Sequence, residues 1–225
     1  MLSEAAARAE GRREAAPAAL ITLLVYVALA GVSWAEGWGL VGLPWWVWLL
    51  VALPVLLLTV DLAMSIRGLG LVRSREAALG LLGLLVLGNV AALVILVAGL
   101  VTTKASDLGG GELLLTGFAI WSANVMVFAL AFWELDAGGP ASRSRAGTRT
   151  GTDFQFPQDS QQDGNVWQPQ VWDYAYVSLT NSIAFSPTDT MPLTLRAKAM
   201  MGAESAISAI TILLVAARAV NILGS

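Results

Sequence analysis

Long apolar runs separated by short polar stretches dominate the chain. A helix that crosses the ~30 Å hydrocarbon core of a bilayer needs about 20 mostly apolar residues. Five runs have about this length, and they cover residues 18–35, 43–64, 77–101, 113–133 and 200–223. The pattern predicts an all-α, polytopic integral membrane protein with about five transmembrane helices.

A further apolar segment, residues 171–184, is too short to span. As a helix of about three turns it would reach only about 20 Å. A polar turn at 185–189 follows, and Pro187 and Pro192 stand on either side of its last residue, Asp189. Thr194 then stands where it can cap the last helix. Irregular backbone at membrane depth persists only inside protein or beside water. We therefore expect a re-entrant hairpin: a short helix, a turn and the final transmembrane helix.

The polar stretches suggest a division of the chain. Its parts are a tail (1–16), a four-helix region (17–136), a polar loop (137–170) and the hairpin with the last helix (171–225). The loop composition is typical of a mobile surface connection, in which residues 153–157 dock back on the membrane face. We expect an uncleaved first helix rather than a signal peptide, because its apolar run exceeds the usual signal core of about 7–15 residues.

Composition agrees with this class and limits the chemistry. The chain is 56% hydrophobic and 13% charged, whereas a soluble domain is roughly one quarter charged. Cysteine and histidine are absent, which excludes disulfides, thiolate chemistry and histidine-based metal sites. No basic patch with interleaved aromatic residues indicates nucleic-acid binding. We expect the lipid bilayer as partner, and no cofactor, metal site or catalytic residues.

The basic residues predict an orientation. If the N-terminus is cytoplasmic, all of the 13 Lys and Arg residues except Lys104 and Arg218 fall in cytoplasmic segments. Short cytoplasmic loops carry an excess of Lys and Arg. We therefore expect a multi-pass protein of the cell membrane with its N-terminus inside.

Polar residues inside the spans are the first candidates for function. Asn89 and Asn124 lie near the middle of the third and fourth spans, where such residues hydrogen-bond between helices or line a pathway. Asp61 lies near the cytoplasmic end of the second span, as a snorkelling group or as the partner of a basic residue.

Two carboxylates, Glu134 and Asp136, end the fourth span before Gly-Gly-Pro at 138–140. A helix C-terminus disfavours negative charge. A cation or an arginine partner would offset this cost, and the alternative is a solvated helix end.

The last helix carries Glu204 on one face with Ser208 and Thr211. An ionisable residue inside a span is a functional-site hypothesis. The alternative is an interfacial glutamate paired with Arg196 or Lys198.

Residues 173–223 resemble the pore hairpin of tetrameric potassium channels, which consists of a pore helix, a selectivity loop and an inner helix. The matching residues are Asp173, Tyr174, Tyr176 and Ser178 for the pore helix, Asp189, Pro192 and Thr194 after the filter, and Ala197, Ala199 and Glu204 for the inner helix. Asn181 is a further polar candidate of the pore helix. The resemblance implies a homo-tetramer that handles monovalent cations, with residues 113–133 as the outer helix.

The filter departs from that pattern, because Ser186, Pro187 and Thr188 stand where Gly-Tyr-Gly would be. Potassium filters present rings of backbone carbonyls, and glycine permits backbone angles that other residues resist. No potassium-selective filter follows, so the pore candidates are the hydroxyls of Ser186 and Thr188 and the carboxylate of Asp189. A potassium-channel pore loop also faces outward, whereas the basic residues place this segment inside.

The whole chain also resembles a group of bacterial polytopic membrane proteins of uncharacterised activity. The resemblance rests on Trp-Glu-Leu-Asp and Gly-Gly-Pro at 133–140 and on Phe-Ser-Pro-Thr-Asp-Thr-Met-Pro-Leu at 185–193. The first functional hypothesis is a channel-like homo-oligomer that passes or senses cations. The second is a non-conducting scaffold or assembly protein that reuses the pore fold. The third, an intramembrane enzyme with Asp61 and Asp136 as a carboxylate pair, is the least favoured.

Overall fold

The computed structural model describes residues 4–39, 43–66, 75–102, 109–146, 151–160, 167–184 and 189–223. Within these ranges, five helices are long and apolar enough to cross a membrane. They are α1 (Glu4–Glu36), α2 (Val47–Ile66), α3 (Arg75–Thr102), α4 (Gly110–Leu135) and α7 (Leu195–Leu223). The chain is therefore an all-α polytopic membrane protein, as predicted from the apolar runs.

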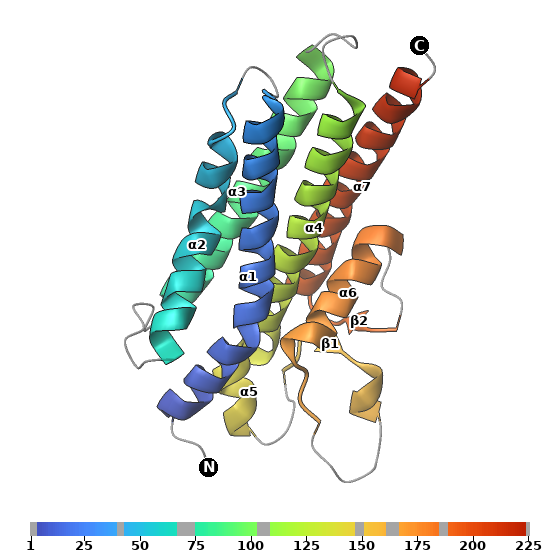
Figure 1. The fold of residues 1–225 in the computed structure, drawn as a ribbon. Helices are drawn as coiled ribbons and strands as arrows, with labels where there is room; N and C mark the ends of the chain where they lie inside the picture. Colours follow the sequence, from blue (N-terminus) through green and yellow to red (C-terminus); the bar gives the residue numbers. More distant parts are fainter. Residues whose placement is uncertain are drawn as a thin grey trace.

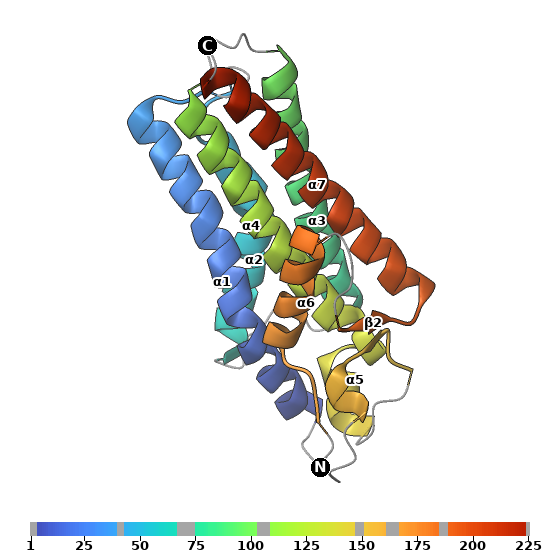
Figure 2. The same ribbon diagram turned by 90° about the vertical axis from the view of Figure 1, so that its right-hand side faces the viewer.

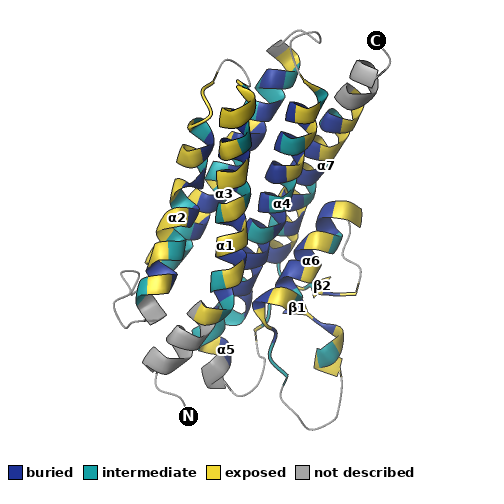
Figure 3. Ribbon diagram, in the orientation of Figure 1, coloured by how far each residue is buried: buried dark blue, intermediate teal, exposed yellow. Residues whose placement is uncertain are grey.

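Helix α4 is the centre of the bundle, and α1, α3, α6 and α7 all pack against it (Figures 1 and 2). Of its apolar span, 67% is buried inside the protein, against 28–39% for the other four helices. Exposed residues instead cover the outward sides of α1 and α2 (Figure 3). Those sides carry large apolar residues such as Leu50, Leu53 and Leu57. An apolar outer surface of this kind suits contact with lipid.

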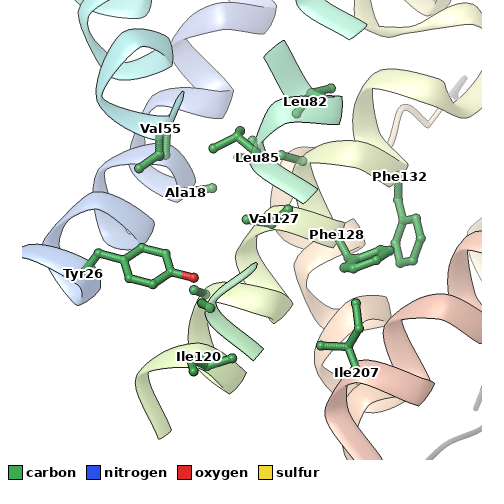
Figure 4. Packing of buried hydrophobic residues seen from close by; sticks show 14 of the residues in the cluster. Ala18, Tyr26, Val55, Leu82, Leu85, Ile120, Val127, Phe128, Phe132 and Ile207 are labelled. Carbon is green, nitrogen blue, oxygen red and sulfur yellow. The ribbon is translucent and has the colours of Figure 1, made fainter. Parts of the chain in front are cut away.

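The core joins side chains from all five long helices. Figure 4 shows Tyr26, Val55, Leu85 and Val127 from α1 to α4 around one packed interior, and Ile207 of α7 near the aromatic rings of α4. Helices α4 and α7 lie close together at Gly117, where an added Cβ would lie 2.5 Å from Cγ2 of Val215. A glycine at this position allows the close helix contact that membrane bundles favour.

Short elements fill the polar segment between α4 and α7. They are η3 (Asp136–Gly138), α5 (Pro140–Ala146), β1 (Phe154–Gln155), η4 (Pro157–Ser160), α6 (Val171–Ala184) and β2 (Met191–Pro192). Strands β1 and β2 pair antiparallel, with Phe154 opposite Pro192. Asp153, Phe154 and Phe156 are buried, so this part of the loop packs against the protein, while its docking on the membrane face stays a prediction. The described parts of this loop are therefore more structured than a mobile connection.

The start of one long helix differs from the sequence pattern, and the start of another agrees with it. Helix α1 begins at Glu4, inside the segment predicted as a polar tail. Helix α7 begins at Leu195, directly after Thr194, the residue predicted to cap it. The predicted cap is confirmed, because the backbone N–H of Ala197 donates to the hydroxyl of Thr194 at 3.3 Å.

Candidate functional site

A chain of buried side-chain hydrogen bonds crosses the bundle. The Tyr26 hydroxyl of α1 donates to Oδ1 of Asn89 in α3 at 3.0 Å. The Asn89 amide in turn donates to Oδ1 of Asn124 in α4 at 2.7 Å. All three residues are buried. The predicted role of Asn89 and Asn124 in bonding between helices is therefore confirmed.

The same series of hydrogen bonds continues from Asn124 to α7. The Asn124 amide donates to the hydroxyl of Ser208 at 2.9 Å and to the backbone carbonyl of Glu204 at 3.3 Å. Glu204, Ser208 and Thr211 are all buried, so the polar face predicted for α7 is confirmed. It faces protein rather than lipid.

The carboxylate of Glu204 contacts α6. Its Oε1 lies within hydrogen-bond distance of the Ser178 hydroxyl, and the Asn181 amide donates to Oε2 at 2.7 Å. Glu204 has no exposed surface, while Lys198 is exposed and Arg196 pairs with Asp153. The interfacial alternative, in which Glu204 pairs with Arg196 or Lys198, is wrong.

This contact lies deep in the bundle. The Ser178 hydroxyl also lies 2.7 Å from the backbone carbonyl of Val125. Val125 precedes the end of α4 at Leu135 by ten residues, which is about 15 Å along the helix axis. Helix α6 therefore runs beside the second half of α4 and reaches its middle, and α7 starts from the same end of the bundle (Figure 2).

A second polar cluster closes the end of α4. The Asp136 carboxylate is buried. Its Oδ1 accepts the backbone N–H groups of Asp153 at 2.6 Å and Phe154 at 3.2 Å, and its Oδ2 accepts the Tyr174 hydroxyl at 2.5 Å. The solvated helix end considered for this carboxylate is therefore wrong. Asp136 fastens β1 and α6 to the end of α4.

Two arginines satisfy the last carbonyls of α4, which have no partner inside the helix. Arg143 donates to the carbonyl oxygens of Trp133 at 2.8 Å and Asp136 at 2.7 Å. Arg196 donates to the carbonyl oxygen of Leu135 at 3.0 Å. Arginines therefore lie at this helix end, as one of the alternatives considered, but they bind backbone carbonyls, and their positive charge complements the helix dipole.

The Gly-Gly-Pro sequence makes the Arg143 contact possible. Gly138 and Gly139 have φ values of 81° and 93°, which only glycine adopts without strain. The chain therefore turns sharply after α4, and α5 carries Arg143 back to the helix end. Sequence reasoning placed these glycines as a helix stop and gave Arg143 no role there.

Asp153 joins the loop to the start of α7. It forms an ion pair with Arg196 and accepts the Thr194 hydroxyl at 2.5 Å. Burial by itself would raise the pKa of Asp153, but the hydrogen bonds from Arg196 and Thr194 and the arginine charge outweigh it and hold the pKa below the usual range. The sequence did not single out Asp153 or Tyr26 as a candidate functional residue, because no local sequence pattern distinguishes them.

The remaining candidates divide between the helix ends and the turn. Asp173 accepts the backbone N–H of Gln170 at 2.7 Å and so closes the first turn of α6. Tyr176 is exposed on the outer side of α6, and Glu134 is half-buried in the last turn of α4. Asp189 is exposed beside β2. The other pore candidates, Ser186, Pro187 and Thr188, lie outside the described residues.

Within the part of the chain that the structure describes, no group of three acidic side chains is arranged to hold a metal ion. Comparison with known proteins gives no further assignment: no family model, curated protein or solved structure matches the chain. The resemblance to potassium-channel pores and the resemblance carried by residues 133–140 and 185–193 therefore stay predictions.

Proposed function

We propose that the protein is a channel-like membrane protein that passes or senses monovalent cations at the turn between α6 and α7. The position of α6 carries the proposal. This helix has 14 residues, or about 21 Å, and its buried face is hydrogen-bonded to the middle of α4 and to α7. A short helix that enters a membrane bundle and returns through a polar turn is the arrangement of a pore hairpin.

The outward side of this hairpin supports assembly with further copies. Trp172, Tyr176 and Ile183 of α6 are between 47% and 57% exposed. On α7, a row of small residues is exposed: Ala199, Gly202, Ala203 and Ala206. Small residues permit close approach of helices in lipid. A homo-oligomer, with four copies as in the channels that the hairpin resembles, would bring several turns together.

The chemistry of the turn suits weak coordination rather than a potassium filter. Asp189, Ser186 and Thr188 offer a carboxylate and two hydroxyls, and rings of such groups select cations in other pores. Glu204 faces α4 and α6 inside the protomer, so the proposal assigns ions to the turn and not to Glu204. We propose no enzymatic activity, since the oxygens of Asp136 are used by protein donors.

We further propose that the N-terminus is cytoplasmic in a bacterial inner membrane. Arg143 and Arg196 lie at the end of the bundle from which α1 starts (Figures 1 and 2). The start of α1 and these two arginines thus lie at one end of the bundle, as the positive-inside rule expects.

The test is cation flux through the purified full chain in liposomes, measured separately for K⁺ and Na⁺. We expect flux in the wild type and a several-fold reduction in Asp189→Asn. The matched control is Glu36→Gln, which removes an exposed carboxylate at the opposite end of the bundle. Equal flux in wild type and Asp189→Asn would remove Asp189 from the mechanism. Liposomes without flux would contradict conduction.

The second candidate is a non-conducting scaffold. The observation in its favour is that the polar groups of the bundle interior bind one another, from Tyr26 through Asn124 to Asn181. Such a network fixes helix positions without leaving polar groups for ions. Silent liposomes together with a stable, stoichiometric partner that co-purifies with the chain would favour this function.

A further inference from the structure

Three oxygen atoms form a row between α7, α6 and α4. Oε1 of Glu204 lies within hydrogen-bond distance of the Ser178 hydroxyl oxygen, which lies 2.7 Å from the carbonyl oxygen of Val125. A close contact between two oxygens is favourable only when one of them donates a hydrogen. The row contains two such contacts and therefore needs two hydrogens.

The Ser178 hydroxyl, in the middle of this row, supplies only one of these two hydrogens. A hydroxyl has a single hydrogen, and a backbone carbonyl can only accept. If Ser178 donates to Val125, the contact between Ser178 and Glu204 must be supplied from the carboxyl group. The other carboxyl oxygen already accepts the Asn181 amide at 2.7 Å, and the second amide hydrogen goes to the carbonyl of Met201 at 3.0 Å.

We propose that Glu204 carries a proton and donates it to Ser178, so that the contact between α6 and α7 is a proton-binding site. The site has one ligand, the proton, held between the Glu204 carboxyl and the Ser178 hydroxyl. Ser178 passes the hydrogen bond on to the backbone of α4. Proton occupancy thus links three helices at the middle of the bundle.

The surroundings of Glu204 favour the neutral acid. Its hydrogen-bonding neighbours among the described residues are uncharged, and an unpaired buried carboxylate is costly. Among the side chains that the structure describes, the charged groups of the elements packed on α7 lie at helix ends or outside the bundle interior. They are Glu112 and Glu134 at the ends of α4, Glu76 in the first turn of α3, Asp173 in the first turn of α6 and, on α7 itself, Arg196, which pairs with Asp153, and the exposed Lys198.

Loss of the proton from Glu204 would break the hydrogen bond between Glu204 and Ser178. The carboxylate could then accept the Ser178 hydrogen only if Ser178 left Val125, and it would still lack a counter-charge. We therefore expect deprotonation to loosen α6 from α4 and α7. The inference does not require that the protein conducts cations, and it holds equally for a scaffold.

Infrared spectroscopy of the full chain in lipid bilayers tests the proposal. At neutral pH we expect the C=O stretching band of a protonated carboxylic acid in the wild type and its loss in Glu204→Gln. Glutamine keeps the shape and donates to Ser178 as the protonated acid does, so the fold should persist. Identical wild-type and Glu204→Gln spectra in this region would overturn the proposal.

Ser178→Ala provides a second, independent measurement. This variant removes the acceptor and leaves the acid, so the band should remain but shift to the higher frequency of a carboxyl group without that hydrogen bond. An unshifted band in Ser178→Ala would contradict the assigned donor and acceptor. This result decides the question even if Glu204→Gln fails to fold.

A cysteine probe tests the consequence for α6, because the chain contains no cysteine. Ala175 is buried on α6. We expect Ala175→Cys to react several-fold faster with a thiol reagent at alkaline pH in the wild-type background than in the Glu204→Gln background. The second background corrects for the higher reactivity of thiols at alkaline pH. Equal rates would contradict the link between proton loss and release of α6.

Discussion

Asn124 is the residue at which three helices meet. It accepts the amide of Asn89 and donates to Ser208 and to the carbonyl of Glu204. Side-chain hydrogen bonds between membrane helices contribute about 0.6 kcal/mol on average and up to about 1.7. We expect Asn124→Ala to lower the free energy of unfolding in detergent by about 1–2 kcal/mol.

The control for this prediction is Thr59→Val. The Thr59 hydroxyl donates only to the carbonyl of Val55 in its own helix among the bonds seen here, at 2.7 Å. Its loss should change the free energy of unfolding by less than about 0.5 kcal/mol. A similar loss in Thr59→Val and Asn124→Ala would show that bonding between helices is not the cause.

Tyr174 allows one hydrogen bond to be removed without disturbing packing. Its hydroxyl donates to Asp136, while its ring packs at right angles to Phe154 and Phe156, with centroid distances of 6.1 and 5.3 Å. We expect Tyr174→Phe to cost about 1.5–3 kcal/mol, the range for a hydrogen bond to a charged group. Tyr176→Phe, at an exposed position of the same helix, should cost almost nothing. Equal costs measured by unfolding would contradict the role given to Asp136.

The role of a single residue was predictable where its depth in the membrane alone decides that role. Asn89, Asn124 and Glu204 stand out in the sequence because a polar group inside an apolar run must find a partner. Their partners were not predictable, since Tyr26 and Ser178 are ordinary residues until the faces of two helices are placed together. The wrong alternative for Glu204, a pair with Arg196 or Lys198, has the same origin, because those residues are close in sequence and Ser178 is close only in space.

The contact between α4 and α7 depends on the absence of a side chain at Gly117. An added Cβ would lie 2.5 Å from Cγ2 of Val215, and the stiff β-branched valine cannot easily move aside. We expect Gly117→Ala to lower the free energy of unfolding by about 1–3 kcal/mol, as for other overpacked positions. Gly31→Ala in α1, where nothing lies within 4 Å, should be neutral or stabilising by up to about 1 kcal/mol. Destabilisation by both variants would point to the helix backbone instead of the helix contact.

The ion pair between Asp153 and Arg196 makes the attachment of the loop sensitive to acid. The pKa of Asp153 is lower in the folded protein than in the unfolded chain. Its stabilising contribution is therefore present at neutral pH and is lost as the pH falls through that lowered pKa. We expect unfolding midpoints to fall on acidification, and a smaller fall in Asp153→Asn. Parallel pH profiles of the two proteins would contradict this assignment.

Elements were predictable where their signal is local. The bounds of α6 and the cap at Thr194 follow from apolar length, prolines and capping chemistry. The start of α1 at Glu4 was missed because its first turns are polar, although they are rich in the strong helix formers Ala, Glu and Arg. The pairing of β1 with β2 was not predictable, since strands of two residues carry no pattern and the paired residues are far apart in the sequence.

The arrangement of the five long helices explains why the sequence predicted their number but not their order in space. Each span can be recognised from the length of its apolar run alone, without knowing which helices pack against it. The central place of α4 depends on which faces are buried, and these helices are apolar on nearly every side. The burial of α4 by α1, α3, α6 and α7 therefore becomes visible only in the structure.

The side of the membrane that holds the long loop decides between the orientation of a potassium-channel hairpin and the orientation predicted from the basic residues. A potassium-channel hairpin would face outward, whereas the basic residues favour a cytoplasmic loop. The chain contains no cysteine. Glu36 ends α1 and Ser160 ends η4, and both residues are exposed. These elements end at opposite ends of the bundle (Figure 1), so Glu36→Cys and Ser160→Cys report on its two sides. We expect an impermeant thiol reagent to label Glu36→Cys in intact cells and Ser160→Cys only after permeabilisation. The reverse pattern would mean that the hairpin keeps the orientation of a channel pore and that the charge distribution does not set the topology.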